Sequence, residues 1–488
     1  MEIDTGVLTV IIVAAVVAAD ASLRIASLVV VPRNRRPQTA IAWLMAIFFI
    51  PIIGLPLFLL VGRARLPRTH RTKQREVNEF IRESTEGFDR VRRDPPWPPW
   101  LEPIVELNRT LGAMPLVGGN SARMWTDDAE SLAAMTADIR AARKTVHVEF
   151  YILSLDETTA DFFDALAEAR ARGVTVRVLL DHLGNAQYPG FRRTKRRLTQ
   201  MGAQWRLALP FQPLRGKIQR PDLRNHRKLL VVDGEVAYTG SQNVIDPGYQ
   251  RAKNAKRGLR WKDYMARFEG PVVAGIDAIF VTDWYCETNQ LLDREAAPAR
   301  SRGDGVLDCQ VVPSGPGFSV ENNLRMFNSL VYAAQRKVIL TSPYFVPDDS
   351  MLYAITTAAQ SGLDVQLFVS EIGDQFLVFH AQRSYYEVLL EAGVRIFLYE
   401  APTILHAKHM TIDDEVSVIG SSNMDMRSFT LDLEISVMVR GGTFLDELRA
   451  IEDDYRAHSR ELTLEEWRTR PARLQVFDNL ARLTAAVQ

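Results

Sequence analysis

Hydrophobic residues dominate two stretches near the start of the chain. Residues 7–31 are apolar except for Asp20 and Arg24, which stand four apart and can pair on one face of a helix. Residues 40–62 carry no charge over 23 residues, a length that crosses a bilayer at a helical rise of about 1.5 Å per residue. Neither stretch has a polar face, as a core helix of a globular domain would. The pattern therefore predicts a membrane anchor of two transmembrane segments, the second one bent by Pro51, Gly54 and Pro56.

The charges around these stretches bear on cleavage and orientation. A cleaved signal peptide needs a basic start, but residues 1–4 contain Glu2 and Asp4, which disfavours cleavage at residues 19–21. Basic residues lie on both sides of the second stretch, and the larger group follows it. Under the positive-inside rule this favours a hairpin anchor with the rest of the chain in the cytoplasm. The two groups are Arg33, Arg35 and Arg36 before the stretch, and Arg63, Arg65, Arg68, Arg71, Lys73 and Arg75 after it.

Beyond about residue 115, helical and apolar strand-like segments alternate, and the whole pattern occurs twice. Such alternation predicts parallel strands joined by helical crossovers, which is an α/β fold. The first copy predicts helices over 128–143 and 158–172 and strands over 145–153 and 174–181; the second predicts helices over 321–335 and 350–361 and strands over 337–346 and 363–370. Duplication predicts two equivalent halves packed with pseudo-twofold symmetry, because that arrangement brings two equivalent sites together.

This pattern divides the chain into four parts. Residues 1–63 form the membrane anchor, 64–115 a basic connector rich in Pro and Trp, 116–300 the first α/β half and 301–488 the second. The tryptophans within residues 97–100 suit either a membrane interface or packing against the following domain, and we expect packing.

Each half contains the same polar motif on a predicted strand. The first motif has His226, Lys228 and Asp233, followed after six residues by Gly240-Ser241-Gln242-Asn243. The second has His406, Lys408 and Asp413, followed after six residues by Gly420-Ser421-Ser422-Asn423. The two histidines are 180 positions apart (406 minus 226). One histidine on a strand would be weak evidence, but the repetition of the whole set predicts a catalytic site.

The residue types in the motif suit phosphodiester chemistry. Side chains alternate along a strand, so the histidine and lysine of each motif point to one face and can meet one ligand. Two imidazoles can act as nucleophile and proton donor on opposite sides of phosphorus, without a metal or another cofactor. Lys228 and Lys408 would stabilise the negative charge of the transition state. The side chains expected to bind phosphate oxygens are Ser241, Asn243, Ser421 and Asn423.

A catalytic histidine is expected to be oriented by a carboxylate on its other ring nitrogen. Glu434, 28 residues after His406 (434 minus 406), is the candidate in the second half. Asp263, 37 residues after His226 (263 minus 226), is its counterpart in the first half. We therefore expect each carboxylate to serve the histidine of its own half.

Composition narrows the classes of function. Lys+Arg and Asp+Glu are both 59, so the chain has no global cationic field of the kind that nucleic-acid-binding proteins use. Cys286 and Cys309 have neither zinc-site nor disulfide-framework spacing, and we expect two reduced thiols. A local basic segment ahead of the first motif predicts a solvated helix, although beside a membrane it would also attract anionic headgroups. Its residues are Arg192, Arg193, Lys195, Arg196, Arg197, Arg215, Lys217, Arg220 and Arg224.

The paired motifs resemble those of the phospholipase D superfamily, and the chain is most similar to bacterial cardiolipin synthases. Further similarity lies in the apolar anchor and in residues 314–316, 341–345 and 423–428, so the resemblance extends over nearly the whole chain. One difference is Gly240-Ser241, where cardiolipin synthases often have Gly-Gly, and it leaves the acceptor preference open.

The resemblance implies roles for the motif residues. His226 would be the nucleophile, His406 the general acid, and Asp233 and Asp413 would position the strands rather than contact substrate. The implied reaction transfers a phosphatidyl group between two phosphatidylglycerol molecules and yields cardiolipin and glycerol through a phosphohistidine. The implied location is the inner membrane of a bacterium, with the catalytic part facing the cytoplasm.

Alternatives to this function remain. A hydrolytic phospholipase D or another phosphatidyltransferase would differ only in whether water or a particular alcohol reaches the intermediate. A soluble nuclease would not need two apolar spans, and a non-catalytic scaffold should have lost a histidine or lysine, whereas all four are present. The expected partners are phospholipids and the membrane, not nucleic acid, and the sequence does not set the oligomeric state.

Overall fold

The computed structural model describes most of the chain and separates into two compact units. The described residues are 5–33, 35, 37–62, 66–86, 96–212, 217–292, 305–318 and 320–484. The units, which we call the anchor unit and the body, are Met1–Ala64 with Arg220–Asp222, and Arg65–Gln219 with Leu223–Gln488. Six charged positions used in the sequence analysis lie outside the described residues: Glu2, Asp4, Arg36, Arg63, Arg65 and Arg215.

The first helix of the anchor unit agrees with the predicted first span. This helix, α1 (Thr5–Val30), contains the one segment of the described chain that is long and apolar enough to cross a membrane, Gly6–Val30. Asp20 and Arg24 pair across one turn at 2.7 Å, as the four-residue spacing predicted.

The second predicted span is not a single helix, and its crossing of the membrane stays a prediction. The stretch forms two short helices, α2 (Pro37–Phe49) and α3 (Pro51–Val61). Pro51 begins α3 because a proline has no N–H to continue the preceding helix but is well suited to the first turn of a new one. The rings of Trp43 and Phe58 lie 5.6 Å apart, whereas fifteen residues of straight helix span about 22 Å. The two helices therefore fold back on each other.

The ends of the α2–α3 hairpin meet. The Arg35 guanidinium, just before α2, donates hydrogen bonds to the carbonyl of Gly62, just after α3, at 2.9 and 3.1 Å. Gly54 permits the close contact of the two helices, since a Cβ at this position would lie 2.3 Å from the carbonyl oxygen of Ala46. The hairpin thus enters and leaves at one place.

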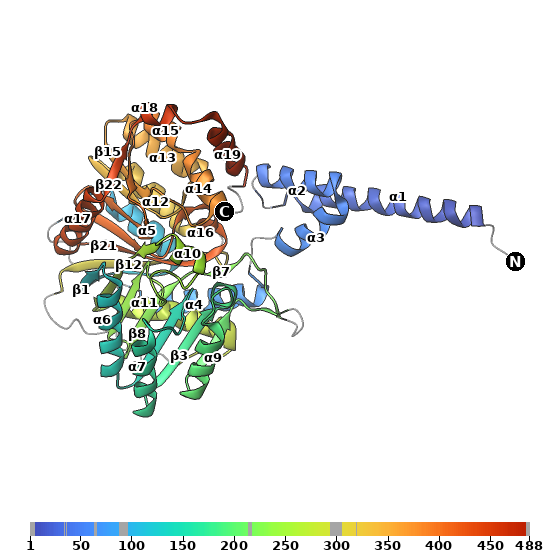
Figure 1. The fold of residues 1–488 in the computed structure, drawn as a ribbon. Coiled ribbons are helices and arrows are strands. Elements are labelled where there is room, and N and C mark those ends of the chain that lie inside the picture. The colour runs from blue at the N-terminus through green and yellow to red at the C-terminus, as the bar shows by residue number, and fades with distance from the viewer. Residues whose placement is uncertain are drawn as a thin grey trace. The chain divides into compact units, whose positions relative to one another are not determined.

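The body is built on one large sheet that runs through both halves of the repeat (Figure 1). From its centre the first half continues through β1 (Leu116–Trp125), β11 (Met265–Glu269), β9 (Val236–Gly240), β8 (Lys228–Val232), β2 (Thr145–Phe150), β3 (Thr175–Asp181) and β4 (Gln204–Ala208). The second half continues through β12 (Leu307–Ser314), β21 (Asp432–Arg440), β19 (Val416–Gly420), β18 (His409–Ile412), β13 (Lys337–Thr341), β15 (Asp364–Ser370), β16 (Arg395–Tyr399) and β22 (Ser459–Leu462).

The two strand orders are equivalent about the central pair. β1 and β12 pair antiparallel at the centre, and each strand outward from β1 has a counterpart outward from β12. β2 pairs parallel with β3, and β13 pairs parallel with β15, as the alternating pattern predicted. The prediction of an α/β fold with two pseudo-twofold-related repeats is confirmed.

Short strands and helices complete the body. The short strands are β5 (Phe211–Gln212), β6 (Lys217–Ile218), β7 (Arg224–Asn225), β10 (Arg260–Lys262), β14 (Phe345–Val346), β17 (Thr403–Leu405) and β20 (Met424–Asp425). The helices up to the end of the first half are α4 (Arg68–Ser84), α5 (Leu101–Gly112), α6 (Asp128–Ala141), α7 (Ala160–Ala171), α8 (His182–Ala186), α9 (Phe191–Gln200), α10 (Ala252–Lys256) and α11 (Val272–Thr288). Those of the second half are α12 (Asn322–Ala333), α13 (Asp349–Gln360), α14 (Phe376–Arg383), α15 (Tyr386–Glu391), α16 (Met426–Thr430), α17 (Gly442–Ala457), α18 (Leu464–Arg468) and α19 (Ala472–Arg482).

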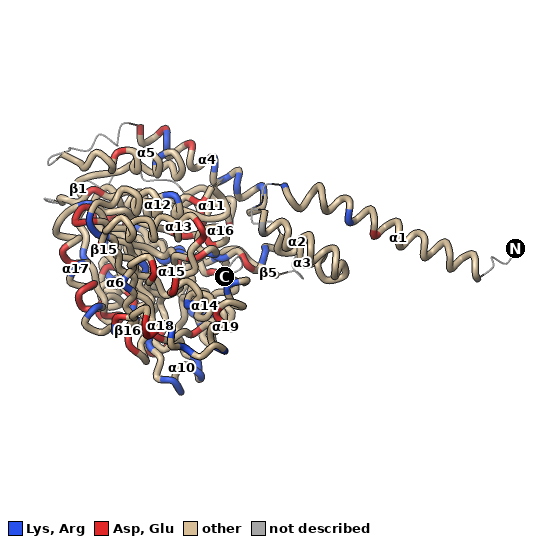
Figure 2. Tube along the Cα trace, turned by 90° about the horizontal axis from the view of Figure 1, so that it is seen from above, with Lys and Arg blue, Asp and Glu red and all other residues tan. Residues whose placement is uncertain are grey.

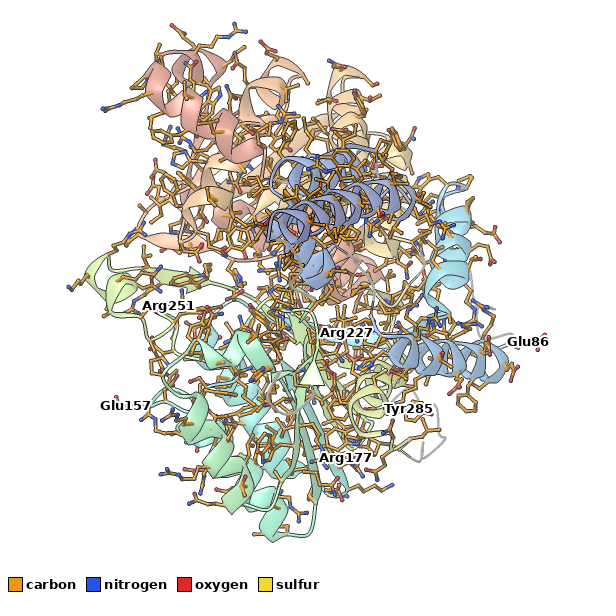
Figure 3. All side chains as sticks on the ribbon, turned by 90° about the vertical axis from the view of Figure 1, so that its right-hand side faces the viewer. Glu86, Glu157, Arg177, Arg227, Arg251 and Tyr285 are labelled. Atoms are coloured by element: carbon orange, nitrogen blue, oxygen red, sulfur yellow. The ribbon has the colours of Figure 1, made fainter. Side chains whose placement is uncertain are left out.

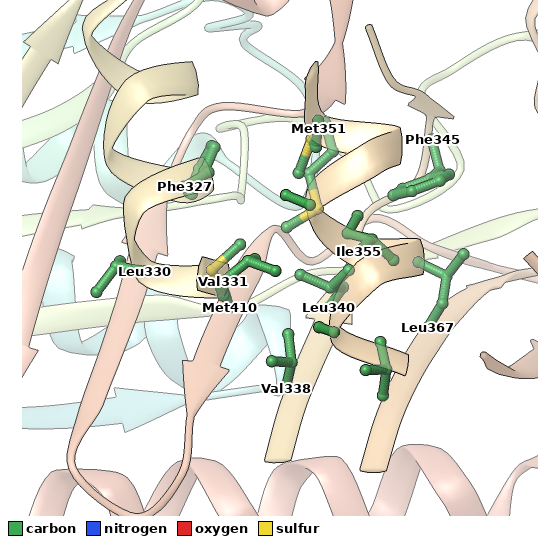
Figure 4. Packing of buried hydrophobic residues seen from close by; sticks show 14 of the residues in the cluster. Phe327, Leu330, Val331, Val338, Leu340, Phe345, Met351, Ile355, Leu367 and Met410 are labelled. Carbon is green, nitrogen blue, oxygen red and sulfur yellow. The ribbon is translucent and has the colours of Figure 1, made fainter. Parts of the chain in front are cut away.

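Apolar side chains hold the helices on the sheet. In the second half, Phe327 of α12 and Ile355 of α13 pack with Leu340 and Leu367 of the strands below them (Figure 4). Burying such side chains stabilises the fold by about 1.5–3 kcal/mol each. Residues 97–100 follow the same principle, because both tryptophans pack against this core, and the expected packing is confirmed.

Candidate active site

Each motif histidine follows a short strand that pairs with the opposite half. β7 pairs parallel with the start of β21, and β17 pairs parallel with β10. The ladder continues by one residue beyond each pair. The His226 N–H donates to the Leu433 carbonyl at 2.9 Å, and the His406 N–H donates to the Lys262 carbonyl at 2.8 Å. Both histidines therefore lie where the halves meet.

The carboxylates pair with the histidines across the two halves. His226 Nδ1 lies 2.9 Å from Glu434 Oε1, and His406 Nδ1 lies 2.7 Å from Asp263 Oδ1. The expectation that each carboxylate serves the histidine of its own half is wrong. The reason is register: Leu433 faces Asn225 and Lys262 faces Leu405 in the parallel ladders, so the next residue on each strand meets the opposite histidine.

The motif serines support these carboxylates. The Ser421 hydroxyl donates to Glu434 Oε2, and its oxygen accepts the Ile435 N–H at 3.0 Å. The Ser241 oxygen accepts the Tyr264 N–H at 3.0 Å, and a hydrogen bond from Ser241 lowers the pKa of Asp263. The serine hydroxyls are thus engaged with the groups that orient the histidines, and their predicted contact with phosphate stays a prediction.

The two motif asparagines differ in their hydrogen bonding. Asn243 donates to the Tyr249 hydroxyl at 2.9 Å and accepts the Ile152 N–H at 3.2 Å. The buried Oδ1 of Asn423 has no partner within the described part of the chain. The two ends of an amide are assigned from hydrogen bonding, so this end can also present its NH₂ group to an anion. A ligand that accepts a hydrogen bond would satisfy it.

Both motif lysines are buried and oriented alike. The Lys228 ammonium donates to the carbonyl of His226 at 2.6 Å, and the Lys408 ammonium donates to the carbonyl of His406. Burial lowers the pKa of Lys228 to about 8 and that of Lys408 to about 7. A buried cation without full compensation favours an anionic ligand, because the ligand restores the charge balance lost with water.

Both motif lysines act on both histidines. Burial, followed by repulsion from Lys228 and Lys408, holds the pKa of His226 well below its ordinary value. Burial also lowers the pKa of His406 to about 4, against the attraction of Asp263, and both motif lysines contribute to this lowering. Because each lysine acts on both imidazoles, the duplicated motifs form one site.

The orienting carboxylates are in different protonation environments. Burial raises the pKa of Glu434 to about 7, although Lys228 and Ser421 oppose the rise. Burial also acts to raise the pKa of Asp263, but attraction to His406 outweighs it and lowers the value to about 2. Asp263 is therefore ionised at neutral pH, whereas Glu434 is close to its midpoint.

The motif aspartates lie away from this site. The Asp233 carboxylate accepts the backbone N–H groups of residues 143–145 at 2.7–2.8 Å. The Asp413 carboxylate accepts those of residues 335–337 at 2.8–3.0 Å. Each aspartate lies five residues beyond its motif lysine, or about 17 Å along an extended strand. They fix the start of β2 and β13. Their inclusion among the catalytic residues is therefore corrected to a role in positioning strands.

A buried ionic network behind His226 was not predicted. Arg227, labelled in Figure 3, lies in the interior of the body. Its guanidinium pairs with Asp283 on α11 and donates through Nε to the Glu434 carbonyl at 3.1 Å. Asp181 pairs with Arg224 at 3.0 Å and accepts the Asn225 N–H at 2.9 Å. The sequence does contain a signal for this network, because Arg224 and Arg227 flank the histidine. A buried strand contains arginines only where acidic partners compensate their charge.

Aromatic rings line both histidines. Tyr151 meets His226 edge to face with a centroid distance of 4.8 Å, and Tyr249 lies 6.4 Å from His406. Within the described residues, no group of three or more His, Cys, Asp or Glu side chains is arranged to hold a metal ion. Cys286 and Cys309 are free thiols, as predicted.

Comparisons with known proteins show the family of the chain. A family model described as "Cardiolipin synthase, PLD-like domain" matches residues 135–284 and 328–454, and one described as "Phospholipase_D-nuclease N-terminal" matches residues 23–63. Cardiolipin synthase A of Proteus mirabilis (strain HI4320) is 33% identical over 456 residues, which cover 92% of each chain. Cardiolipin synthase A of Serratia proteamaculans (strain 568) is 33% identical over 469 residues with the same coverage.

A solved structure supports the fold alone. The phosphatidylserine synthase of Haemophilus influenzae Rd KW20 superposes with a TM-score of 0.60 at 14% identity, and the match covers 78% of this chain and 99% of that one.

The two α/β repeats and their joint His–Lys site define a phosphatidyltransferase of the phospholipase D type. Its phospholipid substrates and its apolar anchor place it among bacterial membrane proteins. Within that class, the chain belongs to the cardiolipin synthase family.

Proposed function

We propose that this enzyme makes cardiolipin and glycerol from two molecules of phosphatidylglycerol. The observation that carries the proposal is the joint site, in which two histidines, each oriented by a carboxylate of the other half, share two buried lysines. The relatives named cardiolipin synthase A support the choice of lipid.

His226 acts as the nucleophile in the first step. Its Nδ1 is paired with Glu434, which leaves Nε2 to attack phosphorus, and its low pKa keeps the imidazole neutral near pH 7. The new N–P bond forms as the bond from phosphorus to the glycerol oxygen breaks. Lys228 and Lys408 balance the charge on the phosphate oxygens.

His406 donates the proton that the departing glycerol needs. Burial and the two motif lysines lower its pKa to about 4, against the attraction of Asp263. A bound phosphodiester raises this pKa, because its negative charge favours the imidazolium. In the second step His406 removes the proton from the hydroxyl of another phosphatidylglycerol, whose oxygen attacks phosphorus and releases His226.

The test is to incubate the purified full-length enzyme with labelled phosphatidylglycerol and to separate the lipid products. Cardiolipin with an equal amount of glycerol is expected. Phosphatidic acid as the main product would show that water resolves the intermediate and would contradict the transferase. An unchanged substrate would contradict catalysis on this lipid altogether.

We also propose that α1 is the only span of the anchor and that the α2–α3 hairpin is re-entrant. Arg35 and Gly62 are hydrogen-bonded, so the hairpin returns to the side from which it enters. The basic residues on both of its flanks then lie on one side, which the positive-inside rule assigns to the cytoplasm, together with the body. Cysteines introduced at positions 33 and 68 should both resist labelling when spheroplasts that contain the variant are treated with a membrane-impermeant maleimide. Labelling of position 33 alone would support two spans.

A further inference from the structure

Two helices near the second motif present an apolar surface without a partner in the described chain. α14 and α19 pack together, and their outward-facing large side chains are between 51% and 80% exposed. We call this set the α14–α19 surface. Its residues are Phe376, Leu377, Val476, Phe477, Leu480 and Leu483. Soluble proteins expose single apolar side chains freely, but a contiguous group of this kind marks an interaction site.

The two helices are held rigidly beneath this surface. His380 of α14 pairs with Asp478 of α19 at 2.6 Å, and Arg470 pairs with the same carboxylate at 2.6 Å. The rings of Phe376 and Phe477 lie 6.4 Å apart across the helix pair. The ion pairs of Asp478 therefore lie on the inner side of the helix pair, and the outer side consists of the apolar side chains.

The exposed charged residues of α14 and α19 themselves are basic. Asp478 is the one acidic residue of α14 and α19, and it is buried, whereas Arg473 and Arg482 are exposed. The neighbouring α10 segment adds four basic residues, Arg251, Lys253, Lys256 and Arg257. Figure 2 shows blue positions at α10. Arg257 ties this segment to the loop before α14 by donating to the Gly373 carbonyl at 3.2 Å. An apolar face rimmed by cations complements a bilayer that contains anionic lipids.

The surface begins close to the active site. The loop that leads from β15 to α14 lines a small cavity together with Tyr344 and Ile404, and Ile404 lies two residues before His406. Ser370, at the start of this loop, accepts the Leu405 N–H at 2.8 Å. The α14–α19 surface is therefore connected, through this loop, to the segment that carries His406.

We propose that the α14–α19 surface, with the basic rim of α10, docks the body onto the anionic lipid bilayer that supplies its substrate. The inference rests on the proposed lipid function but concerns binding, not chemistry. The apolar side chains enter the region of the acyl chains, while the arginines and lysines meet the phosphates. The site then takes its substrates directly from the membrane surface.

The first test measures where the surface lies. The full-length protein, with Cys286→Ser and Cys309→Ala, receives Phe477→Cys or the control Tyr332→Cys, and each is labelled with an environment-sensitive fluorophore. Tyr332 is 59% exposed and lies just before β13, at the edge of the sheet where the parallel strands β13 and β15 begin. α14 follows the end of β15, so the two positions lie at opposite edges of the sheet. The proteins are inserted singly into nanodiscs of phosphatidylglycerol and phosphatidylethanolamine.

A label at position 477 should shift to the blue and be quenched by doxyl lipids, whereas a label at 332 should stay water-like. Water-like emission at 477 would overturn the proposal. A blue shift that doxyl lipids do not quench would overturn it as well, because it would mean that protein covers the surface. One protein per disc removes a second copy as the cause.

The second test separates docking from chemistry. Phe477→Glu with Leu480→Glu should raise the KM for phosphatidylglycerol in vesicles by about tenfold and leave kcat unchanged, since two apolar contacts with the bilayer are lost. Turnover of a monomeric short-chain phosphatidylglycerol should not change, nor should the control Tyr332→Glu affect either substrate. Equal kinetics on vesicles, or an equal loss on both substrates, would refute docking. If no phosphatidylglycerol reacts at all, the proposed function fails while the fluorescence result still stands.

Discussion

The two equivalent histidines, His226 and His406, are surrounded by different ionisable groups in the two halves. The strands next to each motif have equivalent positions in the ladders, and at three of these positions the first half has an ionisable side chain where the second has a neutral one. The equivalent pairs are Glu149 and Thr341, Asp181 and Ser370, and Arg227 and Ala407. One detail is nevertheless kept. Asp181 accepts the N–H of the residue before His226, and Ser370 accepts that of the residue before His406.

This difference separates what the fold needs from what the chemistry needs. The strand before each histidine requires a hydrogen-bond acceptor, and a hydroxyl serves as well as a carboxylate. The charges around His226 do something else, because Arg227 holds the backbone of Glu434, the residue that orients this histidine. The additional ionisable groups lie beside the proposed nucleophile, whose ring must be held in the orientation needed for attack on phosphorus.

The largest effect should come from removing either imidazole. His226→Ala and His406→Ala should each lower turnover of phosphatidylglycerol by about 10⁴-fold or more, whereas exposed His458 can be replaced without loss. A phosphodiester with a nitrophenol leaving group distinguishes the two roles, because it needs little protonation. It should restore phosphoenzyme formation in His406→Ala but not in His226→Ala. The reverse pattern would exchange the assignments.

The ionic network should make the first half more sensitive to a single change than the second. Arg227→Ala leaves Asp283 buried without its partner and should destabilise the fold by about 3–5 kcal/mol. Ser370→Ala removes one buried hydrogen bond and should cost about 1–2 kcal/mol. Thermal unfolding in the same detergent compares them, with Arg227→Met and Asp283→Leu combined as the control that removes both charges. Similar losses for the two single variants would deny the asymmetry.

Crossed orientation predicts which role in the first step each carboxylate supports. Glu434→Gln should weaken nucleophilic attack by His226, and Asp263→Asn should weaken protonation of the departing glycerol by His406, so that each slows phosphoenzyme formation by about 10²-fold. The nitrophenyl substrate should bypass the defect of Asp263→Asn only. Rescue of Glu434→Gln instead would indicate that each carboxylate serves its own half after all.

The motif lysines should give the smallest and most gradual effect. With a pKa of about 8 for Lys228 and about 7 for Lys408, both are protonated at pH 6 and both are neutral at pH 9. Inhibition by tungstate should therefore weaken as pH rises, by about tenfold for each charge lost. Lys228→Met should remove the upper step and Lys408→Met the lower one. Inhibition independent of pH would mean that neither lysine meets the anion.

Much of the architecture could be predicted because it depends on local patterns. The repeat of helical and strand periodicities specified two α/β halves, and the repeated motif with His226 and His406 specified one joint site. The second apolar stretch shows the limit of such patterns. Hydropathy and length describe how much of a segment prefers lipid, but the turn at Pro51 and the contact between Trp43 and Phe58 depend on three-dimensional packing.

By itself, the sequence determined the duplicated fold, the motif residues and the membrane attachment, since each follows from residue type and spacing along the chain. Only the tertiary structure decided which carboxylate meets which histidine, that the motif serines bind those carboxylates, and that Asp233 and Asp413 lie outside the site. The physical reason is that these contacts depend on the register of strands from different halves. Residues 208 positions apart, such as His226 and Glu434, become neighbours through one parallel ladder that no local pattern records.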